Sequence, residues 1–423
     1  MLFGDTLLER CDTGEAIAIR DLAGHEDVGV FALDERLKLG RSLLTCVRSV
    51  GDRPVLRMTL ASGRSVAATS DHGFLTVSGW KRIGELAPGD ALATARALPD
   101  ADQATRWPEH EIVMLAHLLG DGCVSRDPIY YCSRDEANLE VVEKAAAEFG
   151  VTTNRTPGRG VTYVHFPMIG RQARGHTNPI YDWLRELGVM GSVAHTKRVP
   201  SAVQTFDRSD AAMFLKHLWA TDGSVTTARS GRIRIYYATT SRRLAEDVQR
   251  LLWRLGIGGR LRATTPSTSG RHRQGWVVDV SGGEDQLTFL TFVGVHGERG
   301  ERCREALDAL QGHVMNPNVD VIPAEVWDLV RAAMRERGVT TRELARRLGM
   351  AYCGSTLYRS GLSRARMRRV ADAVGDERLG DFAESDVRWD AIVSIQAEGD
   401  TEVFETELQG GRCLLANGVV SHD

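Results

Sequence analysis

The sequence predicts a multidomain fold, in which both chain ends build one all-β domain and the interior carries an α/β insertion and a small helical module. Three observations predict it: short strand-like runs with polar turns fill the first 95 residues and return after residue 389, apolar residues at helical spacing dominate the interior, and arginine-rich short helices precede the last strands. The expected boundaries are 1–98 and 386–423 for the β domain, 99–315 for the insertion and 316–385 for the helical module.

The composition is that of a globular protein without a membrane anchor. The chain has 423 residues, 42% of them hydrophobic, which is enough for the cores of two or three domains. Charges interrupt every apolar stretch before it reaches the roughly 18 residues of a membrane span, and no signal pattern opens the chain. The seven scattered cysteines form no CxxC pair, which argues against disulfides or structural zinc. We expect a monomeric cytoplasmic protein with no membrane partner.

The net charge of −3 conceals two strongly basic stretches. Residues 190–275 carry fifteen Lys or Arg against five acids, and residues 331–370 carry eleven Arg against two Glu. Such surfaces can neutralise phosphates, but a charged run is equally often a solvated face. Charge alone leaves nucleic-acid binding open.

The strands of the β domain are predicted from alternating apolar positions between turn residues. In the first part they lie near 15–19, 28–33, 43–50, 54–60, 65–68 and 73–77, and in the second part near 391–395, 402–408 and 413–416. Because both parts have the same pattern, we expect them to share one sheet system.

The helices of the insertion are predicted from apolar residues three and four positions apart. They are expected at 109–119, 136–149, 210–220 and 242–255. Strands between them make this region α/β.

The helical module should contain four short helices, at 324–335, 341–348, 355–359 and 364–374. Thr340 and Glu343 form a capping-box pattern for the second helix, and Gly349 can end it. Short arginine-rich helices with tight connections resemble a helix-turn-helix, whose recognition helix enters the major groove. The alternative is a plain helical cap that packs on the insertion. On the first interpretation, the candidate DNA contacts are Arg346, Arg347, Arg364, Arg366 and Arg368.

Two strings in the insertion carry the most chemical information. Leu115–Gly122 and Leu215–Gly223 each end an apolar helix with Asp-Gly. The helix macrodipole disfavours an acid at a carboxyl end, so Asp121 and Asp222 need a reason other than helix stability. Two such helices side by side would pair the carboxylates, and a carboxylate pair with phosphate oxygens and waters suits Mg²⁺.

Both strings resemble the motif of LAGLIDADG homing endonucleases, with Asp121 and Asp222 at its acidic position. The 101-residue spacing resembles the single-chain, pseudo-two-fold enzymes of that family. The resemblance implies that both aspartates are catalytic and bind Mg²⁺, and that the substrate is double-stranded DNA. In the family the two helices pack through small residues. Since His217 and Thr221 are bulky, we expect a looser or skewed helix interface.

Four further residues of the insertion are candidates for the same function. Lys197 stands in Lys-Arg-Val-Pro, which resembles the lysine-bearing block of the family, and would support the attacking water or a phosphate. Its alternative is a surface lysine before a turn. Arg232 and Arg234 belong to a stretch that alternates basic and apolar residues as a DNA-facing strand should, and Arg198 adjoins the lysine.

The outer β domain resembles the Hint splicing fold of inteins. Thr69-Ser70-Asp71-His72 resembles the intein TxxH block, Trp80 and Glu85–Asp90 resemble its continuation, and Ala416–Asp423 resembles an intein ending. Met1–Thr6 resembles the first block. The resemblance implies that His72 polarises the amino-terminal scissile peptide, that Thr69 helps to hold it, and that His422 is also a splicing position. It is strongest to large inteins of actinobacterial replicative DNA helicases, which implies flanking host segments as partners and an intein-less insertion site as DNA target.

Several positions depart from the splicing pattern. Met1 offers no hydroxyl or thiol to accept an acyl group, Asp423 stands where the family has a cyclising asparagine, and Arg412 replaces a common histidine. A family class that skips the first nucleophile uses a cysteine and a tryptophan, where this chain has Glu405 and Phe74. We therefore expect no ordinary splicing from this chain. Engineered ends, natural decay and an initiating methionine remain alternative reasons.

Two other functions compete with a splicing element that carries an endonuclease. The first is a DNA-binding protein without cleavage, which metal dependence would distinguish. The second is a Hint autoprocessing domain without nuclease activity, for which the paired acidic helices have no explanation.

Overall fold

The computed structural model describes residues 1–125, 128–167, 178–265, 274–311, 320–351, 354–410 and 413–422. The chain forms two compact units. One comprises Met1–Asp12, Ala16–Pro99 and Asn316–Asp423, and the other comprises Thr13–Glu15 and Asp100–Met315. No helix in the described ranges is long and apolar enough to cross a membrane.

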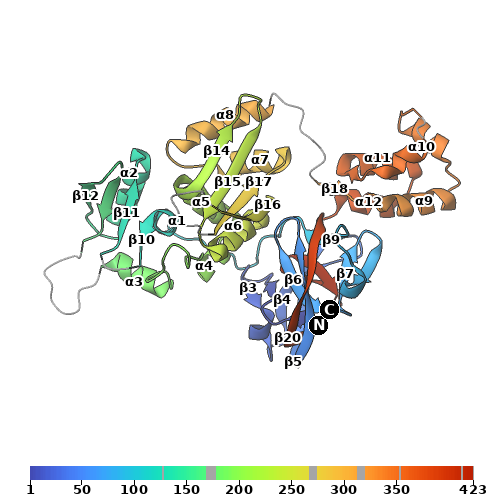
Figure 1. The fold of residues 1–423 in the computed structure, drawn as a ribbon, viewed down its shortest axis with the longest axis horizontal. Helices are drawn as coiled ribbons and strands as arrows, with labels where there is room; N and C mark the ends of the chain where they lie inside the picture. The colour runs from blue at the N-terminus through green and yellow to red at the C-terminus, as the bar shows by residue number, and fades with distance from the viewer. Residues whose placement is uncertain are drawn as a thin grey trace. The chain divides into compact units, whose positions relative to one another are not determined.

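The first unit is built around a ten-stranded antiparallel sheet to which both chain ends contribute (Figure 1). Its order is β21-β22-β7-β9-β20-β1-β6-β5-β4, with β8 paired to β7. The strands are β1 (Leu2–Phe3), β4 (Val28–Leu33), β5 (Leu39–Leu60), β6 (Ser65–Thr69), β7 (Gly73–Thr76), β8 (Gly79–Arg82), β9 (Ala91–Ala95), β20 (Val387–Leu408), β21 (Cys413–Ala416) and β22 (Val419–His422). The short β2 (Leu7–Glu9) and β3 (Ala16–Ala18) form a separate pair.

The longest feature of this unit is the antiparallel ribbon of β5 and β20, each 22 residues long. Their pairing runs from Leu60 opposite Ile392 to Leu44 opposite Leu408, with four register shifts. The sequence predicts two strands in each of these segments. That prediction is wrong, because the polar residues taken for turns, such as Asp52 and Asp400, continue the ladder as exposed strand residues.

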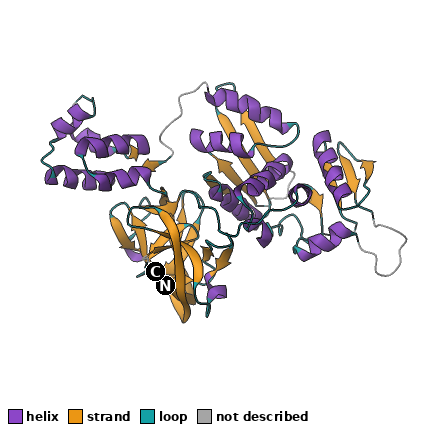
Figure 2. Cartoon of the chain, turned by 180° about the vertical axis from the view of Figure 1, so that it is seen from behind, coloured by secondary structure: helices purple, strands orange, loops and turns teal. Residues whose placement is uncertain are grey.

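The helical module also belongs to the first unit. It consists of β18 (Val321–Ile322), α9 (Val326–Glu336), α10 (Thr341–Arg347), the 3₁₀ turn η5 (Gly354–Arg359), β19 (Leu362–Ser363), α11 (Arg364–Val374) and α12 (Glu377–Glu384). Figure 2 shows its helices grouped together. Trp327, Leu344 and Met367 share its core. Thr340 caps α10 by accepting a hydrogen bond from the Glu343 amide at 3.2 Å, and Gly349 follows with φ of +67°, as the sequence predicts.

The module packs on the β domain. The Arg364 guanidinium donates to the carbonyl oxygens of Ala383 and Ser385 and to that of Val387, where β20 begins. Arg36, in the turn between β4 and β5, forms an ion pair with Asp381 of α12. These contacts place the module on the β domain, whereas the alternative given in the sequence analysis was a helical cap on the insertion.

The second unit repeats one arrangement twice. Its first half has α1 (Glu109–Gly120), β10 (Gly122–Cys123), β11 (Tyr130–Ser133), α2 (Glu136–Glu148), β12 (Asn154–Pro157), β13 (Thr162–His165) and α3 (Pro179–Glu186). After α4 (Ser201–Gln204), the second half has α5 (Arg208–Asp222), β14 (Gly223–Thr227), β15 (Ile233–Thr239), α6 (Arg242–Arg254), β16 (Gly259–Thr264), β17 (Gly275–Val280), α7 (Gly283–Thr288), the π-helix η3 (Phe289–Val293) and α8 (Arg299–Gln311).

The two sheets of this unit have equivalent strand orders, β10-β11-β13-β12 and β14-β15-β17-β16. Each acidic helix directly precedes the edge strand of its own sheet, and one continuous hydrophobic core contains residues of α1 and α5. The pseudo-two-fold repetition thus places the ends of α1 and α5 together.

Candidate active sites

The acidic helices α1 and α5 meet closely at their carboxyl ends. A methyl group on Gly120 would overlap the Thr221 side chain, so only glycine fits this position. The expectation of a loose interface is therefore wrong. Thr221 fits because the residue that faces it has no side chain.

A buried pair of histidines also joins the two helices. His117 Nε2 lies 3.1 Å from His217 Nδ1, and His117 Nδ1 lies 2.9 Å from the Tyr131 hydroxyl. Burial lowers the pKa of His217 to about 3 and also lowers that of His117. Both rings are neutral at pH 7 and can form this donor–acceptor chain. The bulky His217 thus has a specific partner in the interface.

The Asp121 and Asp222 carboxyl groups lie where these helices end. Burial, and next the charge of Asp222, raises the pKa of Asp121 to about 7. Asp222 is in part open to solvent, yet the protein atoms around its carboxyl group raise its pKa. Within the described ranges neither carboxylate accepts a hydrogen bond.

These two residues fit a divalent cation. Unpaired carboxylate oxygens are hard ligands, and a cation between them would relieve their repulsion. No cluster of three or more His, Cys, Asp or Glu side chains that could hold a metal occurs among the described residues. Further ligands would have to be backbone oxygens, water or phosphate.

Lys197 is not a surface residue: its exposed fraction is 7%. Its ammonium group donates to the carbonyl oxygens of Leu118, Gly120 and Gly122, at 3.3, 2.7 and 2.9 Å. These contacts close the carboxyl end of α1, where carbonyl groups lack partners within the helix. The alternative of a surface lysine before a turn is wrong.

A second cation, Arg299, was missed by the sequence analysis. It begins α8, and its Nη1 donates to the carbonyl oxygens of Trp219, Ala220 and Thr221 at the end of α5. No local pattern marks it, since it follows the Asp222 string by 77 positions. Only the fold brings it to the site.

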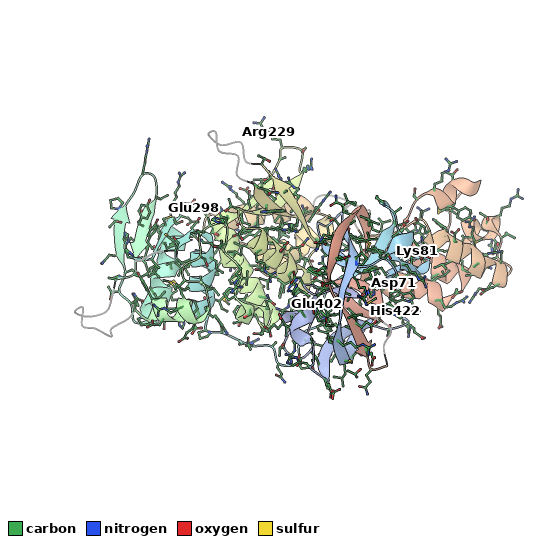
Figure 3. All side chains as sticks on the ribbon, turned by 60° about the horizontal axis from the view of Figure 1, so that its bottom comes forward. Asp71, Lys81, Arg229, Glu298, Glu402 and His422 are labelled. Atoms are coloured by element: carbon green, nitrogen blue, oxygen red, sulfur yellow. The ribbon has the colours of Figure 1, made fainter. Side chains whose placement is uncertain are left out.

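The second half presents a basic sheet face. On β15, Ile233, Ile235 and Tyr237 are buried while Arg232 and Arg234 beside them are exposed, the alternation that the sequence predicts. β16, which β17 separates from β15 in the sheet, adds exposed Arg260 and Arg262, and the Arg229 side chain stands out from the turn before β15 (Figure 3). Asp279 pairs with Arg262 and lies 3.9 Å from Arg234. Arg198 is exposed as well.

The arginines of the helical module have intramolecular partners to differing degrees. Arg346 and Arg347 both pair with Glu343, and Arg368 pairs with Glu384. Arg366 is half-buried. Arg364 is only 15% exposed, and Asp320 and three backbone carbonyls take its donors. The assignment of Arg364 as a DNA contact is wrong on this geometry, because its guanidinium already anchors the module.

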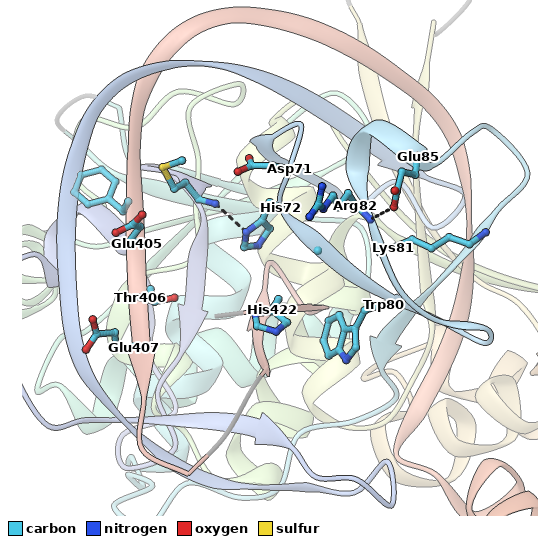
Figure 4. Close-up of a pocket in the computed structure, with 13 residues that line it drawn as sticks. Asp71, His72, Trp80, Lys81, Arg82, Glu85, Glu405, Thr406, Glu407 and His422 are labelled. Atoms are coloured by element: carbon cyan, nitrogen blue, oxygen red, sulfur yellow. Dashed lines mark hydrogen bonds between the residues drawn. The ribbon is translucent and has the colours of Figure 1, made fainter.

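The first unit has its own site, an open pocket of about 540 Å³ formed by both chain ends (Figure 4). The Met1 nitrogen lies 2.9 Å from His72 Nδ1 and 3.3 Å from the Thr69 hydroxyl oxygen. Burial lowers the pKa of His72 to about 3. The ring is therefore neutral and can accept a hydrogen bond from a backbone N–H at residue 1.

The rest of this pocket comes from the last strands. His422 on β22 packs edge-to-face on Trp80 of β8, with ring centroids 5.3 Å apart, and Glu405 of β20 lines the same space. Phe74 is buried against His72 instead of facing the pocket. Arg412 and Asp423 lie outside the described residues. The sequence-predicted residues Met1, Thr69, His72 and His422 are thus brought to one site.

Comparisons with known proteins match both units. A family model described as LAGLIDADG-like domain matches residues 209–294. The replicative DNA helicase DnaB of Rhodothermus marinus is 41% identical over the whole of this chain, which covers 45% of that protein, and the DnaB of a Nostoc species is 37% identical with 49% covered. RecA of Mycobacterium tuberculosis is 29% identical over 88% of this chain, with 49% of RecA covered. The chain spans about half the length of the curated relatives it matches.

Solved structures of two kinds are similar to parts of the chain. The Ssp DnaB mini-intein variant M86 is 35% identical over 23% of this chain and 61% of its own, with a TM-score of 0.23. The homing endonuclease I-DmoI in complex with DNA and Mn is 14% identical over 44% of this chain and 96% of its own, with a TM-score of 0.30.

Proposed function

We propose that this intein-like chain, which carries a LAGLIDADG-like domain, is a protein-splicing element with a site-specific double-strand DNA endonuclease in its interior. The observation that carries the endonuclease is the paired, hydrogen-bond-free carboxylates of Asp121 and Asp222 at the contact of two pseudo-symmetric helices. A cation bound there would activate water and stabilise the leaving oxygen of phosphodiester hydrolysis. The basic face of β15 and β16 would attract the DNA backbone.

The chain's own residues prepare this site before DNA arrives. Lys197 and Arg299 hold the ends of α1 and α5, and the contact at Gly120 sets the separation of the two carboxylates. Such preorganisation favours a cation at the position where negative charge develops on the substrate. We further propose Mg²⁺ as the ion and a DnaB-type helicase, of actinobacterial type, as the host of the flanking segments.

The decisive experiment is cleavage of a helicase gene fragment that lacks the inserted element, with and without Mg²⁺. We expect metal-dependent cutting into two defined pieces by the protein, and DNA that is bound but not cut through both strands with Asp121→Asn. Binding without cutting at any metal concentration would favour the alternative of a DNA-binding protein, and unaltered cutting by Asp121→Asn would refute the metal assignment.

We also propose that splicing is blocked in this chain as written. The residue whose backbone lies against His72 is methionine, whose thioether cannot accept an acyl group. Helicase segments fused to both ends should remain unligated, and Met1→Cys with Asp423→Asn should restore ligation. Adding His72→Ala to that pair is the control, expected to remove it again. Ligation of the fused helicase segments by the unaltered chain would refute this proposal.

A further inference from the structure

An open groove lies on the second unit, between α5 and α8. Its volume is about 490 Å³, and η3 with the residues that follow it contributes part of its lining. The other lining residues repeat at helical spacing, with Ser209, Ala212, Met213 and Lys216 on α5 and Gly300, Cys303, Arg304 and Leu307 on α8. None of them belongs to β15 or β16, so the groove is separate from the basic sheet face.

The π-helix η3 leaves a large apolar side chain exposed in this groove. Its hydrogen bonds join residues five positions apart, as between the Gly294 amide and the Phe289 carbonyl oxygen at 2.8 Å. Phe292, within this wide turn, is 43% exposed, and the half-buried Met213 and Leu307 line the same groove. π-Helical turns are frequent at functional sites, and joined apolar surface marks a site of interaction.

The charged residues of the groove are all positive. Lys216 and Arg304 are exposed and line it, and no acidic side chain does so among the residues that the structure describes. The Lys216 ammonium has no ion pair within the described ranges, and Arg304 approaches Glu301 of its own helix only to 3.8 Å. The Arg208 guanidinium, 5.9 Å from the centroid of the Phe292 ring, adds a third positive charge. The groove therefore combines apolar contact surface with charges that complement an acidic partner.

The dimensions of the groove indicate the shape of that partner. The lining positions run from Ser209 to Lys216 on α5 and from Gly300 to Leu307 on α8. Seven residues of helix rise about 10 Å, which is two turns. A groove between helices accepts another amphipathic helix through apolar residues three and four positions apart. Two turns have room for two such apolar side chains, with carboxylates beside them.

We propose that this groove binds an acidic amphipathic helix of a partner protein. An apolar side chain of that helix lies against Phe292, and its carboxylates pair with Lys216 and Arg304. The surface is built by the second unit alone, so the partner is recruited to the interior of the chain. Binding there does not depend on the proposed endonuclease or splicing functions.

The test measures the binding of two fluorescein-labelled peptides to the full chain by fluorescence anisotropy, in the absence of DNA. Both peptides have about 14 residues, enough to form a helix, and the same Leu and Phe three and four positions apart. One carries Glu at the polar positions and the other carries Lys. We expect the acidic peptide to bind with a micromolar dissociation constant, at least about 10-fold more tightly than the basic peptide.

Single variants tie this binding to the groove. Phe292→Ala should weaken binding of the acidic peptide about 10-fold and should unfold at the temperature of the unaltered protein, because the side chain is partly exposed. Lys216→Glu should weaken binding of the acidic peptide and strengthen that of the basic one. Lys144→Glu on α2 is the matched control, since it makes the same charge change at an exposed lysine outside the groove. It should leave both affinities unchanged.

Three results would overturn the proposal. The first is no binding of the acidic peptide, and the second is equal affinity for both peptides or an equal loss with Lys144→Glu, which nonspecific attraction would give. The third is a concentration-dependent dimer in sedimentation velocity that Phe292→Ala abolishes, because a second copy of the chain would then occupy the groove.

Discussion

The two halves of the second unit have the same strand order but differ in the side chains on the open faces of their sheets. The open face of β15 and β16 carries Arg234, Arg260 and Arg262. The corresponding face of the first half carries Tyr130 and Tyr163, which pack edge-to-face with centroids 5.4 Å apart. The first half's Arg155 is instead turned to Glu143 and Glu136 on α2. Backbone symmetry therefore does not bring chemical symmetry: the second half supplies most of the charge and the first half supplies aromatic contact area.

The largest expected effect tests whether each half cuts one strand. Asp121→Asn and Asp222→Asn each remove one anionic ligand, and losing several kcal/mol of transition-state stabilisation slows double-strand cutting on the order of 1,000-fold. If each half cuts one strand, each variant should convert supercoiled plasmid into nicked circles. The two variants should then nick opposite strands. Nicks on the same strand from both variants would contradict a division of strands between the halves.

The next effect concerns the close contact between the two halves at Gly120 and Thr221. Gly120→Ala would place a methyl group in the space of Thr221, and we expect it to lower the free energy of unfolding by about 3 kcal/mol. Urea denaturation of the full chain, followed by a probe in the second unit, measures this. Thr221→Gly in the same chain should recover most of the loss, and equal losses with and without it would show that the clash is not the cause.

The histidine pair that joins the halves predicts a smaller, pH-dependent effect. Burial depresses the folded-state pKa of His217 to about 3, below the value near 6.5 of an unfolded chain. The stabilisation from the neutral ring is therefore complete above pH 6.5 and is lost as the pH falls toward 3. At pH 5 the free energy of unfolding should already be lower by about 2 kcal/mol. Asp121 acts in the opposite direction, because its raised pKa favours the folded state as the pH falls.

Comparison with His217→Gln separates the two contributions. Between pH 7.5 and 5 the urea midpoint of the unaltered protein should fall further than that of His217→Gln. The same dependence in both proteins would mean that the histidine is not buried in its neutral form.

The smallest effect distinguishes the two sheet faces. Arg234→Ala and Arg262→Ala should each weaken DNA binding a few-fold and reduce the slope of log affinity against log salt by about 1. Tyr163→Ala on the first half should weaken binding without changing that slope. A salt slope that responds equally to both halves would contradict the asymmetry.

The sequence predicts features that depend on local interactions. The cap of α10 by Thr340, the alternation along β15 and the helices that lead to Asp121 and Asp222 all follow from residues within one or two turns of each other. Resemblance to known families added the pairing of His72 with residue 1, which no spacing rule predicts.

The features that the sequence could not predict depend on distant contacts. Arg299 and Arg364 are ordinary arginines in the sequence, and only the fold shows that one closes α5 and the other anchors the helical module. The long ribbon of β5 and β20 was missed because each strand is polar in its middle and is completed by a partner more than 300 residues away.

That ribbon also sets the order in which a newly made chain can fold. Strands β1 and β5 pair with β20, which is synthesised only after the second unit is complete at Met315. Pairing between such distant segments is slow to form, and domains tend to fold as they emerge. The pocket around His72 is therefore assembled after the interior unit has folded. Chemistry in this pocket cannot begin until β20 has been synthesised.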